Sequence, residues 1–202
     1  MASPHHQNTR FNVLNHVDPF LLKKWTRAFS TFFDINRNGL LDWDDFEELI
    51  KMVKESRGEG SEEFRAGEQA LRDIWKALVQ EADVDQDDKV SVEEWQLMWY
   101  DRSKAGKQKK DNWSRLYLDY MFKLLDASSD RLIDLSEYTE IMRFYGISRQ
   151  EAHESFDKFA KNAEGQNLFA IDFDQYSRLW QEYFESTDPE APGNFLFGDI
   201  ES

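Results

Sequence analysis

The chain contains no cysteine and only four histidines among its 202 residues. The absence of cysteine rules out a disulfide framework and fits a reducing compartment. No apolar run approaches the roughly 18 residues that would cross a bilayer, and no signal-peptide hydrophobic segment is present. Ala2 in place of glycine excludes N-terminal myristoylation. The sequence therefore predicts a soluble, cytoplasmic protein.

Positive charge is scarce as well. Lys and Arg number 25 against 40 Asp and Glu, which gives a formal net charge of −15. Such a balance argues against nucleic acid or an anionic membrane as the main partner and suits a chain that collects cations. Apolar mass is ample, with 16 Phe, 7 Trp and 7 Tyr available for a core.

Three twelve-residue windows account for part of this acidity: 34–45, 83–94 and 126–137. Each places oxygen-bearing side chains at its first, third, fifth, ninth and twelfth positions. Calcium takes about 6 to 8 oxygens, and an EF-hand loop supplies them at these positions and from the backbone carbonyl of the seventh. The carboxylates at these positions are Asp34, Asp42 and Asp45; Asp83, Asp85, Asp87 and Glu94; and Asp126, Asp130, Asp134 and Glu137. Three calcium sites are predicted.

Helical periodicity flanks every window, so the predicted fold class is all-α, with four EF-hand helix-loop-helix units in two paired halves. Asp18 caps the first long helix, and Ser148 with Glu151 forms a capping box that starts the seventh. The predicted divisions are a polar leader over 1–17, a first pair of units over 18–101, a basic linker over 102–112, a second pair over 113–186 and a tail over 187–202.

The units of a pair are expected to meet through a short strand contact between the apolar eighth residues of neighbouring loops. These residues are Leu41, Val90, Ile133 and, in a fourth window over 164–175, Ile171. In that fourth window Leu168 stands at the fifth position and Gln175 at the twelfth, and neither is a good calcium ligand. The fourth loop is therefore predicted to keep its shape and its strand but to have lost its metal.

The three acidic loops are not equivalent. Gly39 occupies the sixth position of the first loop, where the chain needs a positive φ, while Asp88 and Arg131 occupy it in the others at a strain of about 1 kcal/mol. Asp45 closes the first loop with a shorter side chain than glutamate, and fewer oxygens favour magnesium. We expect the second loop to bind calcium best, the third next, and the first to be a mixed calcium and magnesium site.

Caps would produce part of this pattern without any metal. The ninth and twelfth positions also read as helix starts, with Asp42, Ser91 and Asp134 as N-caps and Asp45, Glu94 and Glu137 three residues further on. Three windows in register, each with an apolar eighth residue, favour the metal-binding interpretation.

Several segments resemble the invertebrate sarcoplasmic calcium-binding proteins and, within them, the calexcitins: FSTFFD over 29–34, WDDF over 43–46, EEWQLMW over 93–99, RLWQEYF over 178–184 and GNFLFG over 193–198. The resemblance covers nearly the whole chain. It implies a compact four-hand fold, calcium and magnesium binding by the first three loops, and a tail packed on the body. By position it adds Asn36, Asn38 and Ser128 as side-chain ligands and Leu40, Lys89 and Leu132 as carbonyl ligands, with Ser91 at the ninth position of the second loop.

Three functions remain open at this point. A calcium buffer is favoured, since Met52, Met98, Met121 and Met142 lie beside aromatics at core spacing instead of lining a groove. A sensor that opens an apolar groove for a target protein is the first alternative, and calexcitins are regarded as signalling proteins. A luciferin-binding or photoprotein-like carrier is the second, although His153 is the single histidine expected in a helix. No enzyme activity is predicted, and we expect a monomer.

Overall fold

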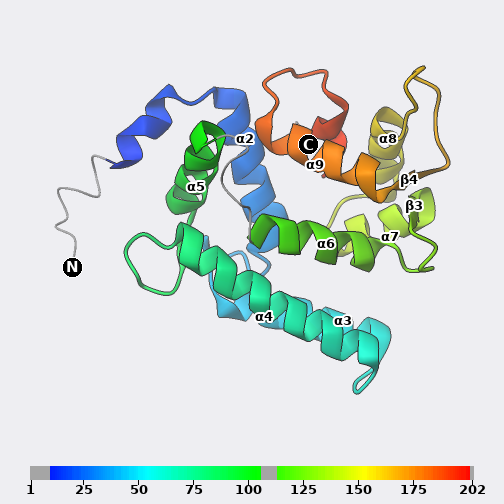
Figure 1. The fold of residues 1–202 in the computed structure, drawn as a ribbon, viewed down its shortest axis with the longest axis horizontal. Helices are drawn as coiled ribbons and strands as arrows, with labels where there is room; N and C mark the ends of the chain where they lie inside the picture. Colours follow the sequence, from blue (N-terminus) through cyan, green and yellow to red (C-terminus); the bar gives the residue numbers. More distant parts are fainter. Residues whose placement is uncertain (1–9, 106–112, 201–202) are drawn as a thin grey trace. The chain divides into compact units, whose positions relative to one another are not determined.

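A computed structural model describes residues 10–105 and 113–200 of the chain. They divide into two compact units, Met1–Tyr120 and Met121–Ser202. The structure is mainly helical, as predicted, with two small two-stranded antiparallel sheets (Figure 1).

The first unit contains two helix-loop-helix segments. In chain order its elements are a 3-10 helix η1 (Asn12–His16), α2 (Pro19–Ala28), a π-helical turn η2 (Phe29–Phe33), β1 (Leu40–Leu41), α3 (Trp43–Arg57), α4 (Glu62–Ala82), β2 (Val90–Ser91) and α5 (Val92–Ala105), followed by the start of α6 (Trp113–Leu125). Asp18 caps α2 as predicted, because its Oδ1 accepts a hydrogen bond of 2.8 Å from the Phe20 amide.

The second unit repeats the arrangement. It comprises the end of α6, then β3 (Leu132–Asp134), α7 (Leu135–Phe144), α8 (Arg149–Phe159), β4 (Ala170–Asp172), α9 (Phe173–Glu185) and a 3-10 helix η4 (Pro192–Phe195). The Ser148 hydroxyl caps α8 by accepting from the Glu151 amide at 3.1 Å. The Glu151 carboxylate reaches further and accepts from the Asp199 amide at 3.0 Å, which ties α8 to the tail.

Strand pairing follows the predicted register. Leu41 lies opposite Val90 in the first sheet, and Ile133 lies opposite Ile171 in the second. All four side chains are buried. Each short sheet therefore joins two loops through an apolar contact, which fixes the two loops of a pair side by side.

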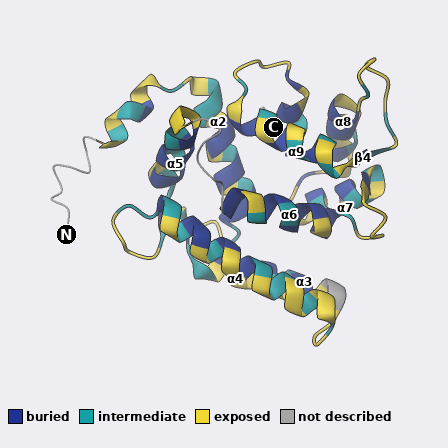
Figure 2. Cartoon of the chain, viewed as in Figure 1, coloured by how far each residue is buried: buried dark blue, intermediate teal, exposed yellow. Residues whose placement is uncertain are grey.

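An aromatic cluster forms the core of the first unit. The Phe33 ring lies 4.7 Å from that of Trp95 and 4.6 Å from that of Tyr117, and Trp95 lies 5.4 Å from Trp113. Phe33 immediately precedes the first loop and Trp95 immediately follows the second. Both loops are thus anchored at one end in the same buried cluster. Figure 2 shows buried positions, in dark blue, along α2, α5 and the start of α6.

The division between units falls inside α6, whereas the sequence had suggested the stretch 102–112 as the divide. Trp113 and Tyr117 belong to α6 but pack on Phe33 of the first unit, so the first turns of this helix stay with that core. Arg102, the first residue of the predicted basic linker, lies in α5. Its buried guanidinium lies 3.2 Å from Glu81 Oε1 and 5.0 Å from the Trp99 ring centroid. Residues 106–112 of the predicted linker and 1–9 of the predicted leader lie outside the described residues.

The tail packs on the second unit. The Phe197 ring lies edge-on to those of Trp180, Tyr183 and Phe184 of α9 at 5.5, 4.8 and 6.2 Å. The Tyr138 hydroxyl of α7 donates to the Leu196 carbonyl at 3.0 Å. Leu196 and Phe197 are almost fully buried, so the tail contributes to the core of this unit.

Candidate metal centres

The first carboxylate of each acidic loop organises the loop backbone. Both oxygens of Asp34 accept hydrogen bonds from loop amides, those of Asn38 and Gly39, at 3.0 and 2.9 Å. The corresponding bonds run from Asp87 and Asp88 to Asp83 and from Asp130 and Arg131 to Asp126. The three loops therefore share one backbone path around their first carboxylate.

The last carboxylate closes each loop from the other side. Asp45 accepts from the Asn36 and Asp42 amides, both at 3.0 Å. Glu137 accepts from the Ser128 and Asp134 amides at 2.9 and 3.1 Å. In the second loop Glu94 accepts from Ser91 as expected, but its other oxygen accepts from Val84, one residue earlier than in the other loops.

The predicted helix starts at these closing positions are confirmed. Asp42 with Asp45 and Asp134 with Glu137 form reciprocal capping boxes. Ser91 and Glu94 exchange the same pair of bonds, since the Glu94 amide donates to the Ser91 hydroxyl at 3.3 Å and the Ser91 amide donates to the Glu94 carboxylate at 2.9 Å. The closing carboxylates are thereby held in place by hydrogen bonds within the loop.

Backbone conformation also follows the expected pattern. The sixth residues Gly39, Asp88 and Arg131 have φ of 85°, 60° and 70°. Arg37, Gln86 and Ser129, at the fourth positions, have φ of 58°, 65° and 60°. A side chain at positive φ is strained, so two of the loops keep this geometry at a position where glycine is absent.

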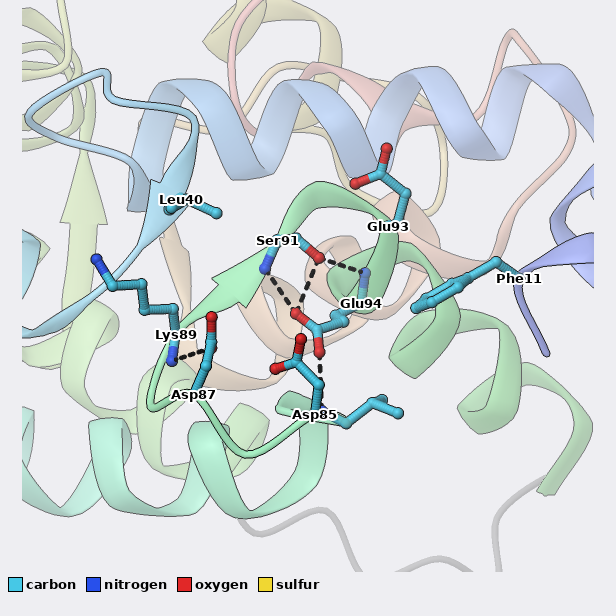
Figure 3. A pocket seen from close by; sticks show the side chains of 9 residues that line it. Phe11, Leu40, Asp85, Asp87, Lys89, Ser91, Glu93 and Glu94 are labelled. Carbon is cyan, nitrogen blue, oxygen red and sulfur yellow. Dashed lines mark hydrogen bonds between the residues drawn. The ribbon is translucent and has the colours of Figure 1, made fainter. Parts of the chain in front are cut away.

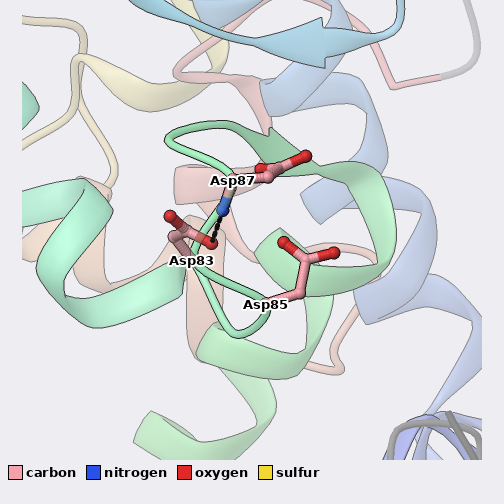
Figure 4. A group of neighbouring side chains, drawn as sticks. All are labelled: Asp83, Asp85 and Asp87. Carbon is pink, nitrogen blue, oxygen red and sulfur yellow. Dashed lines mark hydrogen bonds between the residues drawn. The ribbon is translucent and has the colours of Figure 1, made fainter. Parts of the chain in front are cut away.

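The second loop concentrates the most negative charge. Carboxylate oxygens of Asp83, Asp85 and Asp87 all lie within 4.8 Å of one another (Figure 4). Removal from water, followed by the charges of Asp87, Glu94 and Asp83, raises the pKa of the Asp85 carboxyl above its ordinary value. Such crowding of hard oxygen donors suits a divalent cation, which would relieve the repulsion.

These acids open into a pocket that also has an apolar side. Its lining includes Asp85, Asp87, Glu94, Leu40 of the neighbouring loop and Phe11 from the segment before η1 (Figure 3). Phe11 was not expected at the site, and nothing in its local sequence indicates this position. Its contact with the loop depends on how the N-terminal segment folds back on the first unit.

The first loop is the most enclosed. Its end carboxylates Asp34 and Asp45 are 5% and 0% exposed. Burial raises the pKa of Asp45; the amides of Asn36 and Asp42 oppose this, and the charges of Asp42 and Asp34 reinforce it. Its third and fifth positions are the neutral Asn36 and Asn38, whose side-chain oxygens accept backbone amides at 3.0 and 2.8 Å.

A cation from the second loop reaches into the first. The Lys89 ammonium lies 3.2 Å from Oδ2 of Asp42. Lys89 was predicted to serve through its backbone carbonyl, and the role of its side chain was missed. The strand register contains the signal, because the pairing of Leu41 with Val90 places the next residue, Asp42, opposite Lys89.

The third loop keeps the same hydrogen bonds in a more open setting. Asp126 and Glu137 are partly exposed, and Asp130 and Asp134 are exposed. The Ser128 hydroxyl at the third position lies 3.5 Å from Asp126 Oδ1. The third loop has one fewer carboxylate in its first five positions than the second loop.

The fourth loop has a different shape, so the prediction that it resembles the others is wrong. Helix α8 ends at Phe159, and Ala160 has φ −79° and ψ 74°, nearly the values of Asp34 (−79° and 75°). Ala160, and not the predicted Glu164, therefore stands where the other loops begin. The chain then forms a hairpin closed by a 2.7 Å bond from the Leu168 amide to the Ala160 carbonyl.

Only the second half of the fourth loop matches the others. Asp172 and Gln175 form the capping box, and β4 pairs with β3. The reason for the difference lies in the sequence, since Ala160 has no carboxylate to accept hydrogen bonds from the backbone amides that follow it. Asn162 does so instead, its Oδ1 accepting from Glu164 and Gln166 at 3.0 and 2.9 Å, which turns the chain into the hairpin.

The chain is similar to known calcium-binding proteins along most of its length. It is 36% identical over 185 residues to calexcitin-1 of Caenorhabditis elegans, an alignment covering 92% of this chain and 89% of that protein. It is 28% identical to sarcoplasmic calcium-binding proteins I, III and IV of Branchiostoma lanceolatum, covering 90% of this chain and 98% of theirs.

The structure of an amphioxus sarcoplasmic calcium-binding protein shares the fold, with a TM-score of 0.75 at 23% identity over 90% of this chain and 98% of that one. A search of protein-family models gave no match. Within the described residues, every helix is too short or too polar to cross a membrane.

Proposed function

The chain belongs to the family of calexcitins and sarcoplasmic calcium-binding proteins, and from that premise we propose that it is a cytoplasmic, monomeric calcium-binding protein with three EF-hand sites. The sites are the loops 34–45, 83–94 and 126–137. The observation that carries this proposal is the hydrogen-bond pattern common to the three loops. In each loop the first and twelfth carboxylates accept hydrogen bonds from loop amides and so fix the backbone from both sides.

The ligands of each proposed site follow from the twelve-residue pattern. They are Asp34, Asn36, Asn38, the Leu40 carbonyl, Asp42 and Asp45; Asp83, Asp85, Asp87, the Lys89 carbonyl, Ser91 and Glu94; and Asp126, Ser128, Asp130, the Leu132 carbonyl, Asp134 and Glu137. The bound ion would neutralise the carboxylates, whose mutual repulsion is strongest in the second loop.

The first site is proposed to take magnesium as well as calcium. Asp45 is short and fully buried, and both its oxygens already accept backbone amides. A carboxylate held in this way offers less freedom for the bidentate contact that calcium prefers, whereas magnesium needs fewer oxygens at shorter distances.

Buffering is the role the side-chain packing supports best. A sensor exposes an apolar, methionine-rich groove on binding calcium. Here Met98, Met121 and Met142 are buried in the core, and the tail residues Leu196 and Phe197 already cover α9. A groove in the second unit would form only if the tail left it.

The sensor alternative is kept because two aromatic side chains among the described residues are exposed to solvent. Phe169, immediately before β4, is 96% exposed, and Phe144, at the end of α7, is 43% exposed. Exposed aromatics of this kind occur at protein-binding surfaces.

The luciferin-binding or photoprotein-like alternative would need polar side chains, histidine among them, that line an internal cavity. His16 is exposed and His153 partly exposed, so neither histidine in the described residues reaches the interior.

Calorimetric titration of the metal-free protein with calcium, repeated in about 1 mM magnesium, tests the proposal. We expect three calcium ions per chain, with at least one site weakened by magnesium. Uptake of no calcium would refute the function, and a large calcium-induced rise in apolar-dye fluorescence would replace the buffer by a sensor.

A further inference from the structure

We propose that the side chain of Lys89 is a built-in competitor that lowers the divalent-ion affinity of the first loop. The inference rests on the proposed function, because it concerns the strength of one of the proposed sites. It assigns Lys89 two opposite roles: its carbonyl faces the second site, and its ammonium weakens the first.

The contact that carries the inference joins the two loops. Lys89 Nζ lies 3.2 Å from Oδ2 of Asp42, the ninth residue of the first loop. The other oxygen of Asp42, Oδ1, accepts the Asp44 amide at 3.1 Å as the cap of α3. Both carboxylate oxygens are therefore already engaged. An ion that uses Asp42, directly or through a water, has to share or displace the ammonium.

The position of Lys89 is fixed by the sheet. Leu40 pairs with Ser91 and Leu41 with Val90. Lys89, the residue just before β2, therefore lies opposite Asp42, the residue just after β1. Figure 3 shows the Lys89 side chain pointing away from Glu94, the closing residue of its own loop. Its backbone amide donates to Asp87 at 2.9 Å, which holds the residue in the second loop while the side chain extends to the first.

The second unit provides an internal comparison. Asp134 occupies the ninth position of the third loop, as Asp42 does in the first, but its partner across the sheet is Ala170. An alanine presents no charge to the carboxylate. The competitor is therefore absent at the equivalent place, although the two sheets have the same antiparallel pairing.

The size of the effect follows from exposure. The Lys89 side chain is 42% exposed and that of Asp42 14%, so water screens part of the attraction. Ion pairs in such settings contribute at most about 1 kcal/mol, which corresponds to roughly a fivefold change in affinity at the upper end.

Substitution of Lys89 by glutamine tests the inference in the full-length protein. The K89Q variant keeps the backbone carbonyl and much of the side-chain length but removes the charge. The amide resonance of Gly39, at the sixth position of the first loop, reports this site alone during a calcium titration. We expect its midpoint to move to about two- to fivefold lower free calcium in K89Q.

A matched control removes the same charge elsewhere. Lys51 lies on α3 of the same unit, 63% exposed and 3.7 Å from Glu48. K51Q should leave the Gly39 midpoint within error of the parent. Equal shifts in K51Q and K89Q would show a general charge effect and overturn the inference, as would an unchanged midpoint in K89Q.

The reverse substitution places a lysine where the second unit has none. A170K should put an ammonium opposite Asp134 and weaken the third site, read at the Arg131 amide, by a similar factor. An unchanged third site in a folded A170K protein would count against the mechanism. Failure of the parent protein to bind calcium at any loop would instead refute the proposed function, so the two failures are distinguishable.

Discussion

The two loop pairs are built on the same short antiparallel sheet yet differ in how complete they are. In the first unit both loops have a carboxylate at the end of the entering helix, Asp34 and Asp83, and both fold around it. In the second unit Asp126 does so, but Ala160 cannot, and the fourth loop becomes a hairpin. The comparison teaches that strand pairing and loop shape are separable: an apolar eighth residue and a cap suffice for the strand pair, and the first carboxylate decides the path of the loop.

The largest expected effect is on calcium binding by the second loop, which Glu94 closes, whereas Gln175 closes the fourth loop. E94Q should remove the second calcium site, with an affinity loss of about a hundredfold or more, because a neutral amide cannot provide the bidentate carboxylate. Calorimetry should count one ion fewer per chain. The converse variant, Q175E, should gain no site, because the fourth loop lacks the first carboxylate and its backbone path. Unchanged stoichiometry in E94Q would contradict the proposed second site.

The next effect concerns the tail, which the second unit uses to complete its core. F197A should lower the free energy of unfolding by about 3 to 5 kcal/mol, because a buried aromatic ring is replaced by a cavity. Denaturant unfolding measures this loss. F169A is the matched control, since that ring is 96% exposed and its removal should change stability by about 0.5 kcal/mol or less. Similar losses in the two variants would contradict the packing of the tail.

A smaller effect is expected from the sixth position, where the first and third loops differ in backbone strain. Gly39 and Arg131 both have positive φ, but only glycine adopts it without strain. R131G should relieve about 1 kcal/mol and raise the calcium affinity of the third site about fivefold. R131A separates strain from charge, because it removes the charge and keeps the side chain at positive φ. Equal gains in R131A and R131G would assign the effect to charge alone.

The smallest expected effect is on the pH dependence of stability. It concerns Asp45, the buried closing residue of the first loop, whereas Glu137, which closes the third loop, is partly exposed. Burial raises the pKa of Asp45 above its unfolded value, so the folded metal-free protein holds this proton more tightly. The stabilising contribution of protonated Asp45 to the free energy of unfolding is fully present at pH values below the pKa of the unfolded state. This contribution is lost as the pH rises through the pKa of the folded state.

The D45N variant tests that sign. At pH 7 it should be more stable than the parent in chelator, and this advantage should shrink as the pH is lowered toward 4, while the first calcium site is lost. Thermal unfolding in chelator across this pH range measures the difference. A D45N protein that is less stable than the parent at pH 7 would show that the hydrogen bonds to Asp45 outweigh its burial.

Much of the local structure could be predicted because it depends on residues close together in the chain. The caps at Asp42, Asp134 and Ser148 and the positive φ of Asp88 and Arg131 follow from short-range hydrogen bonds and spacing. The strand register was predictable as well, since the eighth residue is the one apolar residue of each loop that is buried.

The errors share a different origin. The spacing from Ile171 predicts that the fourth loop starts at Glu164, and spacing cannot show that Asn162 forms a hairpin before this residue. The sequence assigns Arg102 to a basic linker because four lysines follow it before residue 111, yet its side chain packs on Trp99 and pairs with Glu81.

The sequence by itself determined where three acidic loops lie, which oxygens they offer and which residues pair between neighbouring loops. Each of these depends on a repeat of a few residues, and the spacing of a repeat survives in the sequence. Tertiary structure alone decided that Trp113 and Tyr117 pack with the first unit, that Phe197 completes the second, and that the ammonium of Lys89 meets Asp42. These contacts join residues far apart in the chain, and burial of apolar surface and pairing of charge select them only once the helices have packed.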